Sequence, residues 1–191
     1  MARPVNFNQT EVLDKLTLVF WEKGFYDSSI EDLSSASGLN RSSLYNSFGN
    51  KEAIFKQVLK HYQEHYSKQR LEQILKTSPV KKALEEYFLS LIETEQNRRL
   101  GCLLVNTSIE LSPHNSQIDK DLQKSFKRVE DIFYQVLEKA QNNNEIDSNK
   151  DISLIAKYLL NNVYGIRVSA RAGSTKKDLK QIVKVILKSI Y

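Results

Sequence analysis

The chain has 191 residues, of which 40% are hydrophobic and 27% are charged, a composition typical of a globular protein with a buried core. No run of about 18 apolar residues is present, so we expect no membrane-spanning helix. The first residues lack the apolar core of a signal peptide, and the single cysteine, Cys102, excludes an internal disulfide framework. We therefore expect a cytoplasmic protein.

The net charge is +5, but the excess positive charge does not lie in the N-terminal part of the chain. Residues 1–56 hold six Lys or Arg and seven Asp or Glu, whereas residues 57–191 hold the other 22 basic and 16 acidic residues. A global positive charge favours approach to a polyanion. Because the two parts differ in this way, any nucleic-acid contact by residues 1–56 must depend on individual side chains.

Glycines and prolines divide the chain into apolar segments of helical length and periodicity, which predicts an all-helical protein of about nine helices. The first helix begins near Asn8, which can form a variant of the capping box with Glu11, and the next two helices lie within residues 28–55. Asn50 caps a fourth helix, which continues to Tyr66. The later helices are expected to begin at Ser78-Pro79, with the serine as cap, at Gly101, and after Ser116 as cap, and the last two cover residues 150–171 and 175–190.

Residues 28–55, SSIEDLSSASGLNRSSLYNSFGNKEAIF, have the pattern of a helix-turn-helix. Ser28 or Ser29 can cap the first of its two helices, and Asn40 can cap the second. Gly38 permits an unusual backbone conformation at the turn between them. The second helix of such a motif is shaped to enter the major groove of DNA.

This second helix carries apolar residues on one side and polar residues on the other. Leu44 and Phe48 are spaced to point inward. The outward side chains suit DNA, because Arg41 can reach guanine or a phosphate and Asn46 can contact a base edge. Lys51 lies in the first turn of the next helix, where a cation opposes the helix dipole, which favours a phosphate contact. The predicted DNA-binding residues are Ser28, Ser29, Arg41, Ser42, Ser43, Tyr45, Asn46 and Lys51.

Residues 24–55 resemble the N-terminal module of the tetracycline-repressor (TetR) family of transcriptional regulators. The resemblance rests on Gly24-Phe25, Ser28-Ser29-Ile30, Asp32-Leu33, Ala36, Gly38-Leu39, Leu44-Tyr45, Phe48 and Lys51-Glu52. The family usually has threonine in place of Ser28 and alanine in place of Ser34, so the chain departs mildly from the pattern. The rest of the chain resembles the family in helical architecture more than in motif.

The resemblance implies an all-α fold with a three-helix helix-turn-helix DNA-binding domain over residues 1–55. A larger helical domain for effector binding and dimerisation would cover residues 56–191. Family members are homodimers that bind near-palindromic operators, and most are repressors released by a small molecule. The resemblance therefore implies a homodimer through the last two helices, whose small and apolar residues permit such packing. These residues are Ile152, Ile155, Ala156, Leu159, Val163, Gly165, Ile166, Ala170 and Ala172.

The resemblance also implies an effector pocket among the middle helices. The candidate wall residues are aromatic, although aromatic residues at helical spacing are most often part of a core. They are Tyr87, Phe88, Phe126, Phe133, Tyr158 and Tyr164. No phosphate loop or dinucleotide fingerprint is present in the sequence, and no cofactor is predicted.

Cys102 is a candidate sensor of oxidants or electrophiles. It follows Gly101 at the start of a predicted short helix, where backbone amides can lower the pKa of a thiol. Arg98 and Arg99 are near in sequence and could add to that effect. The segment also resembles that of family members with a cysteine here, some of which sense such compounds. The alternative is that Cys102 is a buried small apolar residue.

Two other functions remain open. His61, Glu64 and His65 form H-x-x-E-H, the inverted zincin order, which could place two histidines and a glutamate on one helix face. A catalytic zinc needs a third protein ligand, and the remaining histidine, His114, follows a proline in a turn. A helical binding module without a DNA role is the other alternative, but it leaves the outward polar residues without a shared role. We therefore predict a regulator and not an enzyme.

Overall fold

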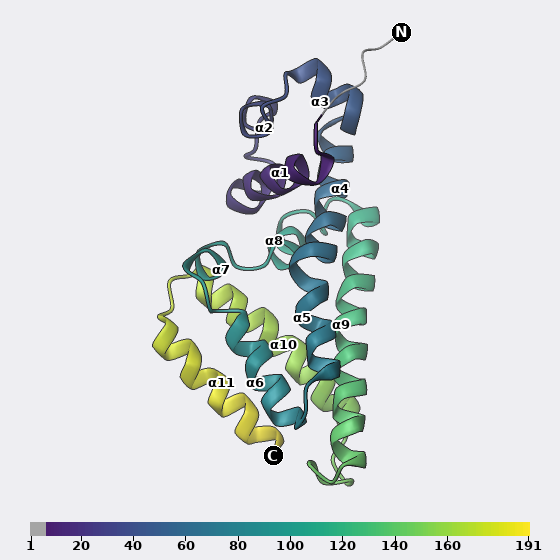
Figure 1. Ribbon diagram of the computed structural model, residues 1–191, viewed down its shortest axis with the longest axis vertical. Helices are drawn as coiled ribbons and strands as arrows, with labels where there is room; N and C mark the ends of the chain where they lie inside the picture. Colours follow the sequence, from purple (N-terminus) through teal and green to yellow (C-terminus); the bar gives the residue numbers. More distant parts are fainter. Residues whose placement is uncertain (1–6) are drawn as a thin grey trace. The chain divides into compact units, whose positions relative to one another are not determined.

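The computed structural model describes residues 7–191, which form helices joined by loops (Figure 1). No strand occurs within this range, so the all-helical prediction is confirmed. The helices belong to two compact units, the first ending at Tyr66 and the second beginning at Ser67. The sequence placed the boundary between residues 55 and 56. The units divide later because the fourth helix packs along the first helix and so belongs to the first unit.

The first unit holds four helices, and each begins at a residue whose side chain accepts a hydrogen bond from the first turn. They are α1 (Gln9–Lys23), α2 (Ile30–Ser37), α3 (Arg41–Phe48) and α4 (Lys51–Tyr62). The four caps are Asn8, Ser29, Asn40 and Asn50. The buried core of the unit is rich in aromatic residues: Phe20, Trp21 and Phe55 are at most 1% exposed.

A π-helical segment, Gln63–Ser67, follows α4 directly and leads into α5. The remaining helices are α5 (Lys68–Lys76), α6 (Val80–Ser90), α7 (Glu95–Leu100), α8 (Leu103–Glu110), α9 (Ser116–Asn142), α10 (Ile152–Arg171) and α11 (Lys176–Ile190). Residues 7–191 thus form eleven α-helical segments where the sequence predicted about nine. The π-helical segment separates α5 from α4, and α7 is an additional short helix. No helix in this range combines the length and apolar character that crossing a membrane requires.

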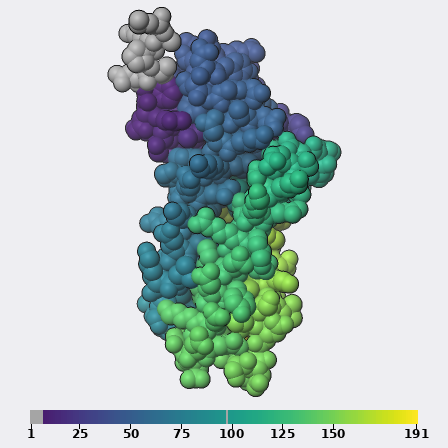
Figure 2. All heavy atoms as spheres, turned by 90° about the vertical axis from the view of Figure 1, so that its right-hand side faces the viewer, coloured from purple at the N-terminus to yellow at the C-terminus, as the bar shows by residue number. Residues whose placement is uncertain are grey.

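The second unit is a bundle in which α6 packs against α5, α9 and α11, while α10 packs against α9 and α11. The long helix α9 covers much of one face of this unit, as Figure 2 shows. The centre of the bundle is aromatic. The rings of Phe88 and Phe133 are parallel, with centroids 6.3 Å apart, and both side chains are fully buried.

Two helix starts in this unit differ from the prediction by one residue. Asn115, and not Ser116, caps α9, because its side chain accepts from the Ile118 amide at 3.1 Å. Pro79 keeps an extended backbone, so α6 begins at Val80 without a local side-chain cap. The Val80 amide donates instead to the carboxylate of Glu145 at 2.7 Å.

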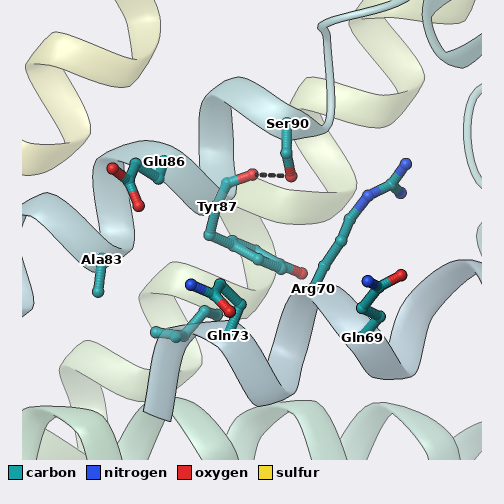
Figure 3. Close-up of a pocket in the computed structure, with 8 residues that line it drawn as sticks. Gln69, Arg70, Gln73, Ala83, Glu86, Tyr87 and Ser90 are labelled. Carbon is teal, nitrogen blue, oxygen red and sulfur yellow. Dashed lines mark hydrogen bonds between the residues drawn. The ribbon is translucent and has the colours of Figure 1, made fainter. Parts of the chain in front are cut away.

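A cavity of about 320 Å³ lies between α5 and α6 (Figure 3). The α5 helix contributes mostly polar side chains to its wall, and α6 contributes Ala83 and Tyr87 among others. The cavity lies wholly within the second unit.

Candidate DNA-binding site

The start of α2 is fixed by a reciprocal cap between Ser29 and Asp32. The Asp32 amide donates to Ser29 Oγ at 3.0 Å, and the Ser29 amide donates to the Asp32 carboxylate at 2.9 Å. Lys23 Nζ lies 2.6 Å from the same carboxylate. The hydrogen bond from Lys23, together with those from Ser29, lowers the pKa of Asp32 to about 2. Asp32 therefore stays ionised and ties α1 to the helix-turn-helix.

The neighbouring serine has a different position from the one predicted. Ser28 is 2% exposed, and its hydroxyl donates to the Phe25 carbonyl at 2.9 Å. The hydroxyl of Ser28 is therefore buried and bonded within the fold. Because of this burial, the structure does not support a contact between the Ser28 side chain and DNA. Ser29 is exposed, so of the two serines it is the one whose side chain faces solvent.

The turn between α2 and α3 is held by glycine and by serine side chains. Gly38 has φ 74° and ψ 9°, a left-handed conformation that favours glycine even where space is available for a side chain. Ser34 Oγ donates to the Leu39 carbonyl at 2.5 Å, and the Leu39 amide donates to Ser37 Oγ at 3.2 Å. These bonds fix the angle at which the chain enters α3.

Helix α3 buries one face and exposes the other, as predicted. Leu44 and Phe48 are buried, whereas Arg41 and Asn46 are exposed. The Arg41 guanidinium lies 5.5 Å from the centroid of the Tyr45 ring, a cation–π contact that groups these two side chains. The remaining predicted residues of this helix also lie on it without full burial: Ser42 is exposed and Ser43 is half-buried. The structure therefore brings Arg41, Ser42, Tyr45 and Asn46 together on one short helix.

Lys51 is held at the start of α4 by contacts with the α1–α2 loop. Its Nζ lies 4.7 Å from the centroid of the Phe25 ring and donates to the Tyr26 carbonyl at 3.4 Å. The cation is thus positioned by an aromatic face and by a carbonyl, although it opposes the dipole of its own helix. This placement is consistent with a role beyond helix stability.

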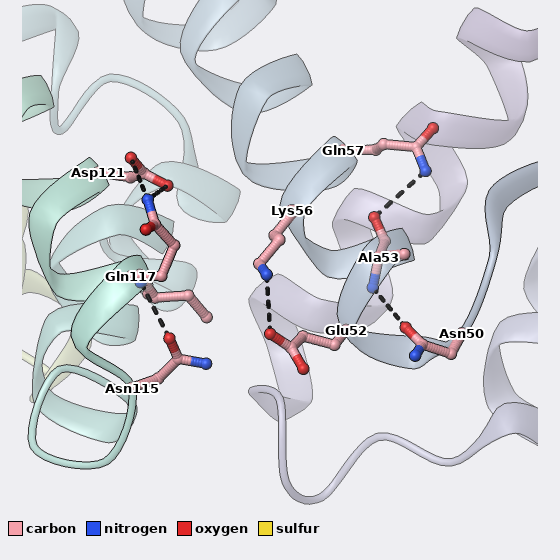
Figure 4. Close-up of polar contacts among 9 residues, drawn as sticks. Asn50, Glu52, Ala53, Lys56, Gln57, Asn115, Gln117 and Asp121 are labelled. Atoms are coloured by element: carbon pink, nitrogen blue, oxygen red, sulfur yellow. Dashed lines mark hydrogen bonds and ion pairs between the residues drawn. The ribbon is translucent and has the colours of Figure 1, made fainter.

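Side-chain hydrogen bonds hold the junction of α3 and α4, and Figure 4 shows the one between Asn50 and Ala53. Gly49 has φ 86°, and a Cβ atom there would lie 2.9 Å from the Cβ of Ala53. Asn50 accepts from the Ala53 amide at 2.9 Å, and Gln57 Nε2 donates to the Phe48 carbonyl at 2.8 Å. The polar face of α3 is therefore presented by a fixed backbone.

The six aromatic residues predicted for an effector pocket do not form one wall. Phe88 and Phe133 are core residues, and the Phe126 ring packs edge-on against Tyr164 with centroids 5.0 Å apart. Tyr158 is exposed, and its hydroxyl accepts from Ser189 at 3.2 Å. Of the six, only Tyr87 lines the cavity between α5 and α6. The sequence missed the α5 residues of this cavity because polar residues on a helix ordinarily indicate a solvent face.

Cys102 is the N-cap residue of α8 and is half-buried. The two arginines near it in sequence are engaged elsewhere: Arg98 donates to the Ile92 carbonyl at 3.1 Å, and Arg99 lies 3.8 Å from Glu95. The thiol lies instead within electrostatic range of Tyr87 and Tyr164. Burial raises the pKa of both tyrosines, so these groups are neutral phenols.

Of the H-x-x-E-H residues, His61 is buried within the first unit, whereas Glu64 and His65 are exposed. The Nε2 atom of His61 lies 2.7 Å from Asp14 Oδ1, and the centroids of the His61 and His65 rings are 4.2 Å apart. The Oε1 atom of Glu64 lies 4.0 Å from Lys60 Nζ. Among the side chains of residues 7–191 that the structure describes, no group of three or more His, Cys, Asp or Glu is arranged to hold a metal ion.

An apolar stripe on the outside of α10 and α11 was missed by the sequence reasoning. The residues proposed there for a dimer interface include Ala156, Leu159, Ile166 and Ala170, which are buried in the core of their own unit. The stripe consists instead of Leu154, Tyr158, Val168, Ile182 and Val185, all exposed. On α10, Leu154 and Tyr158 are four residues apart and Val168 follows exposed Gly165 by three, and on α11 Ile182 and Val185 are three apart; this helical spacing is a signal that could have indicated the stripe.

Two family models match the chain. Residues 12–58 match bacterial regulatory proteins of the tetR family, and residues 81–186 match the tetracyclin repressor-like C-terminal domain. The HTH-type transcriptional repressor ComR of Escherichia coli (strain K12) is 30% identical over 98% of this chain and 90% of its own length. The HTH-type transcriptional repressor DhaR of Mycobacterium sp. (strain GP1) is 28% identical over 94% of this chain and 90% of its own.

Solved structures share the fold. The TetR family regulator CifR, as a cysteine mutant complexed with operator DNA, matches with a TM-score of 0.89 at 20% identity, covering 100% of both chains. A TetR family regulator from Cytophaga hutchinsonii matches with a TM-score of 0.81 at 20% identity, covering 97% of this chain and 98% of its own. With the family established by the two matched models and by ComR, the chain belongs to the tetR family of bacterial regulatory proteins and is a DNA-binding transcriptional regulator.

Proposed function

We propose that this regulator binds a near-palindromic operator as a homodimer, represses transcription there, and is released by a ligand. The observation that carries the proposal is the polar face of α3, fixed over buried Leu44 and Phe48. A protein that reads an operator acts where the chromosome lies, so we place it in the cytoplasm. CifR was solved with 26-bp operator DNA, which supports the same use of this fold here.

In this proposal α3 enters the major groove. Arg41 and Asn46, both exposed, contact base edges, while the hydroxyls of Ser42, Ser43 and Tyr45 bind phosphates. The cation–π contact between Arg41 and Tyr45 limits the conformations of the arginine before DNA binds. The short serine side chains allow the N-terminal end of the helix to approach the groove closely.

Lys51 and Ser29 complete the proposed contacts on the DNA backbone. Lys51 Nζ is held over Phe25, so it can bind a phosphate from a preset position. Ser29 is exposed at the start of α2, where helix amides favour an anion. Ser28 would contribute only through its backbone, because its hydroxyl is buried.

The test uses Tyr45→Ala and Lys51→Ala with a selected operator fragment and a fluorescence-anisotropy titration. We expect each change to weaken operator binding by about tenfold or more, with the oligomeric state unchanged. Lys56→Ala is the matched control, since Lys56 is an exposed lysine of α4 that pairs with Glu52 at 2.8 Å (Figure 4). Wild-type affinity in both variants would remove these two residues from the interface.

The proposed homodimer uses the apolar stripe of α10 and α11. Leu154 and Val185 are 64% and 66% exposed, and Ser189 of α11 donates a hydrogen bond to the hydroxyl of Tyr158 of α10. Exposed apolar side chains three or four residues apart on each helix suit packing against an equivalent pair of helices. A two-fold dimer would then present two α3 helices to two half-sites.

The proposed release is a population shift, in which a ligand stabilises a dimer whose α3 helices no longer fit successive major grooves.

Cys102 is a proposed sensor for an electrophile or oxidant. The check is operator binding after treatment with diamide or N-ethylmaleimide. We expect the wild type to lose operator binding and Cys102→Ser to keep it. An identical response of the two proteins would assign Cys102 to packing alone.

A further inference from the structure

The cavity between α5 and α6 has one apolar side and one polar side. Ile74, Ala83 and the ring of Tyr87 form the apolar part of the wall. Gln69, Arg70 and Gln73 come from α5, and Figure 3 shows the Tyr87 side chain extending toward Arg70. Its volume of about 320 Å³ falls at the small end of the range for ligand sites in proteins.

The Tyr87 hydroxyl is a buried donor at this cavity. The side chain is 7% exposed, and it is one of the residues that line the cavity. Burial raises the pKa of this phenol, so it keeps its proton and can donate. A phenol hydroxyl at the wall of a cavity can donate a hydrogen bond to an acceptor atom of a ligand bound there.

Two arginines act on the Tyr87 side of the cavity, although only one of them lines it. Arg70 lines the cavity, and both Arg70 and Arg167 act electrostatically on the Tyr87 hydroxyl. Arg167 is 3% exposed and donates to the Leu91 carbonyl at 2.7 Å. The one carboxylate among the lining residues, Glu86, lies 3.7 Å from Lys82 and points away from Arg70 (Figure 3).

We propose that this cavity binds a small organic carboxylate with an apolar body. In this proposal the guanidinium of Arg70 donates two parallel N–H···O hydrogen bonds to the carboxylate of the ligand. Tyr87 donates a further hydrogen bond, and Ile74 and Ala83 contact the apolar body of the ligand. The inference rests on the proposed function in one respect, because it makes this carboxylate the releasing ligand.

The test is isothermal titration calorimetry on the full chain without DNA. The probes are propionate, benzoate and phenylacetate, each paired with its neutral amide, which has nearly the same shape. We expect at least one carboxylate to bind about tenfold more tightly than its amide, because only the anion gains the charged contact. The proposal is overturned if no carboxylate binds more tightly than its amide.

Variants assign the binding to the cavity. Arg70→Gln should weaken carboxylate binding by about tenfold or more, Arg70→Lys by less, and Tyr87→Phe by severalfold. Arg128→Gln is the matched control, because Arg128 is an exposed arginine of α9 that does not line the cavity. Thermal unfolding verifies that each variant is folded. Unchanged carboxylate binding in both Arg70→Gln and Tyr87→Phe would contradict the assignment.

Operator binding by the wild-type protein is measured on the same preparation. Operator binding without carboxylate binding would refute the ligand class and leave the proposed function intact. Carboxylate binding without any operator binding would refute the proposed function and leave the ligand class intact. Release of the operator by the bound carboxylate, absent with its amide, would connect the two.

Discussion

The helices of the two units begin in different ways. In the first unit, all four helices have a side-chain cap, and α1, α2 and α3 each end at a glycine with positive φ. In the second unit, α5, α6 and α8 begin without a side-chain cap bond, and α6 depends on Glu145 from a distant part of the chain. Local signals therefore define the helices of the first unit, whereas long-range contacts define several helices of the second.

The two units also differ in the kind of side chain that they expose. The first unit exposes polar side chains on α3 over a buried apolar face, which suits a hydrated polyanion. The second unit exposes apolar side chains on α10 and α11, which suits another protein surface. The proposed function assigns DNA contact to the first unit and self-association to the second, and three sets of substitutions test this assignment.

The largest effect is expected from the double change Leu154→Glu and Val185→Glu on the apolar stripe. The introduced glutamates of the two subunits would repel each other in a two-fold interface, so the dimer should become a monomer. Sedimentation velocity measures this change. Operator affinity should then fall by about 100-fold or more, because two half-sites are no longer bound together. Ile109→Glu is the control, since Ile109 is 69% exposed but lies on α8. A double variant that remains dimeric would exclude this stripe as the interface.

A smaller effect is expected from cap removal, which compares the two units directly. Asn40→Ala and Asn115→Ala should each lower the free energy of unfolding by about 1 kcal/mol in urea titrations. Asn40→Ala should also weaken operator binding, because the cap orders the exposed first turn of an eight-residue helix. Asn115→Ala should leave operator binding nearly unchanged, since α9 has 27 residues and a long buried face. Equal loss of operator binding in both variants would contradict this division.

The smallest effect concerns the pH dependence of the first unit. The folded pKa of Asp32 is about 2, below its ordinary value of 3.8, so the folded state favours the ionised carboxylate. Its contribution to stability is therefore complete above about pH 4 and is lost as the pH falls toward 2. Asp32→Asn should be less stable than wild type near neutral pH, and the difference should narrow in acid. A difference that stays constant in urea unfolding between neutral pH and about pH 3 would show that the Lys23 and Ser29 contacts do not act through this charge.

The sequence predicted most of the first unit because its signals lie within a few residues of the structure they define. Asn8, Asn40 and Asn50 were predicted as caps and act as caps. The choice between the two adjacent serines was not predictable, because the burial of Ser28 depends on the Phe25 carbonyl in the loop before α2.

The second unit was predicted less completely, for a physical reason. Periodicity shows that α10 has apolar residues on more than one side, but it does not show which side meets the rest of the bundle. Leu159 faces the core and Leu154 faces solvent, although both fit a helical apolar pattern. The cavity was missed for a similar reason, since Arg70 faces it only because α5 and α6 leave a gap between them.

Selection of bound DNA fragments from a random pool by the purified protein is the most direct test of operator binding by a dimer. We predict an enriched near-palindromic sequence, with half-sites about 34–36 Å apart along the duplex or a multiple of that distance, as two α3 helices of a dimer require. Enrichment of no sequence, or of a single half-site without a symmetry mate, would contradict a dimeric regulator that binds its operator through α3.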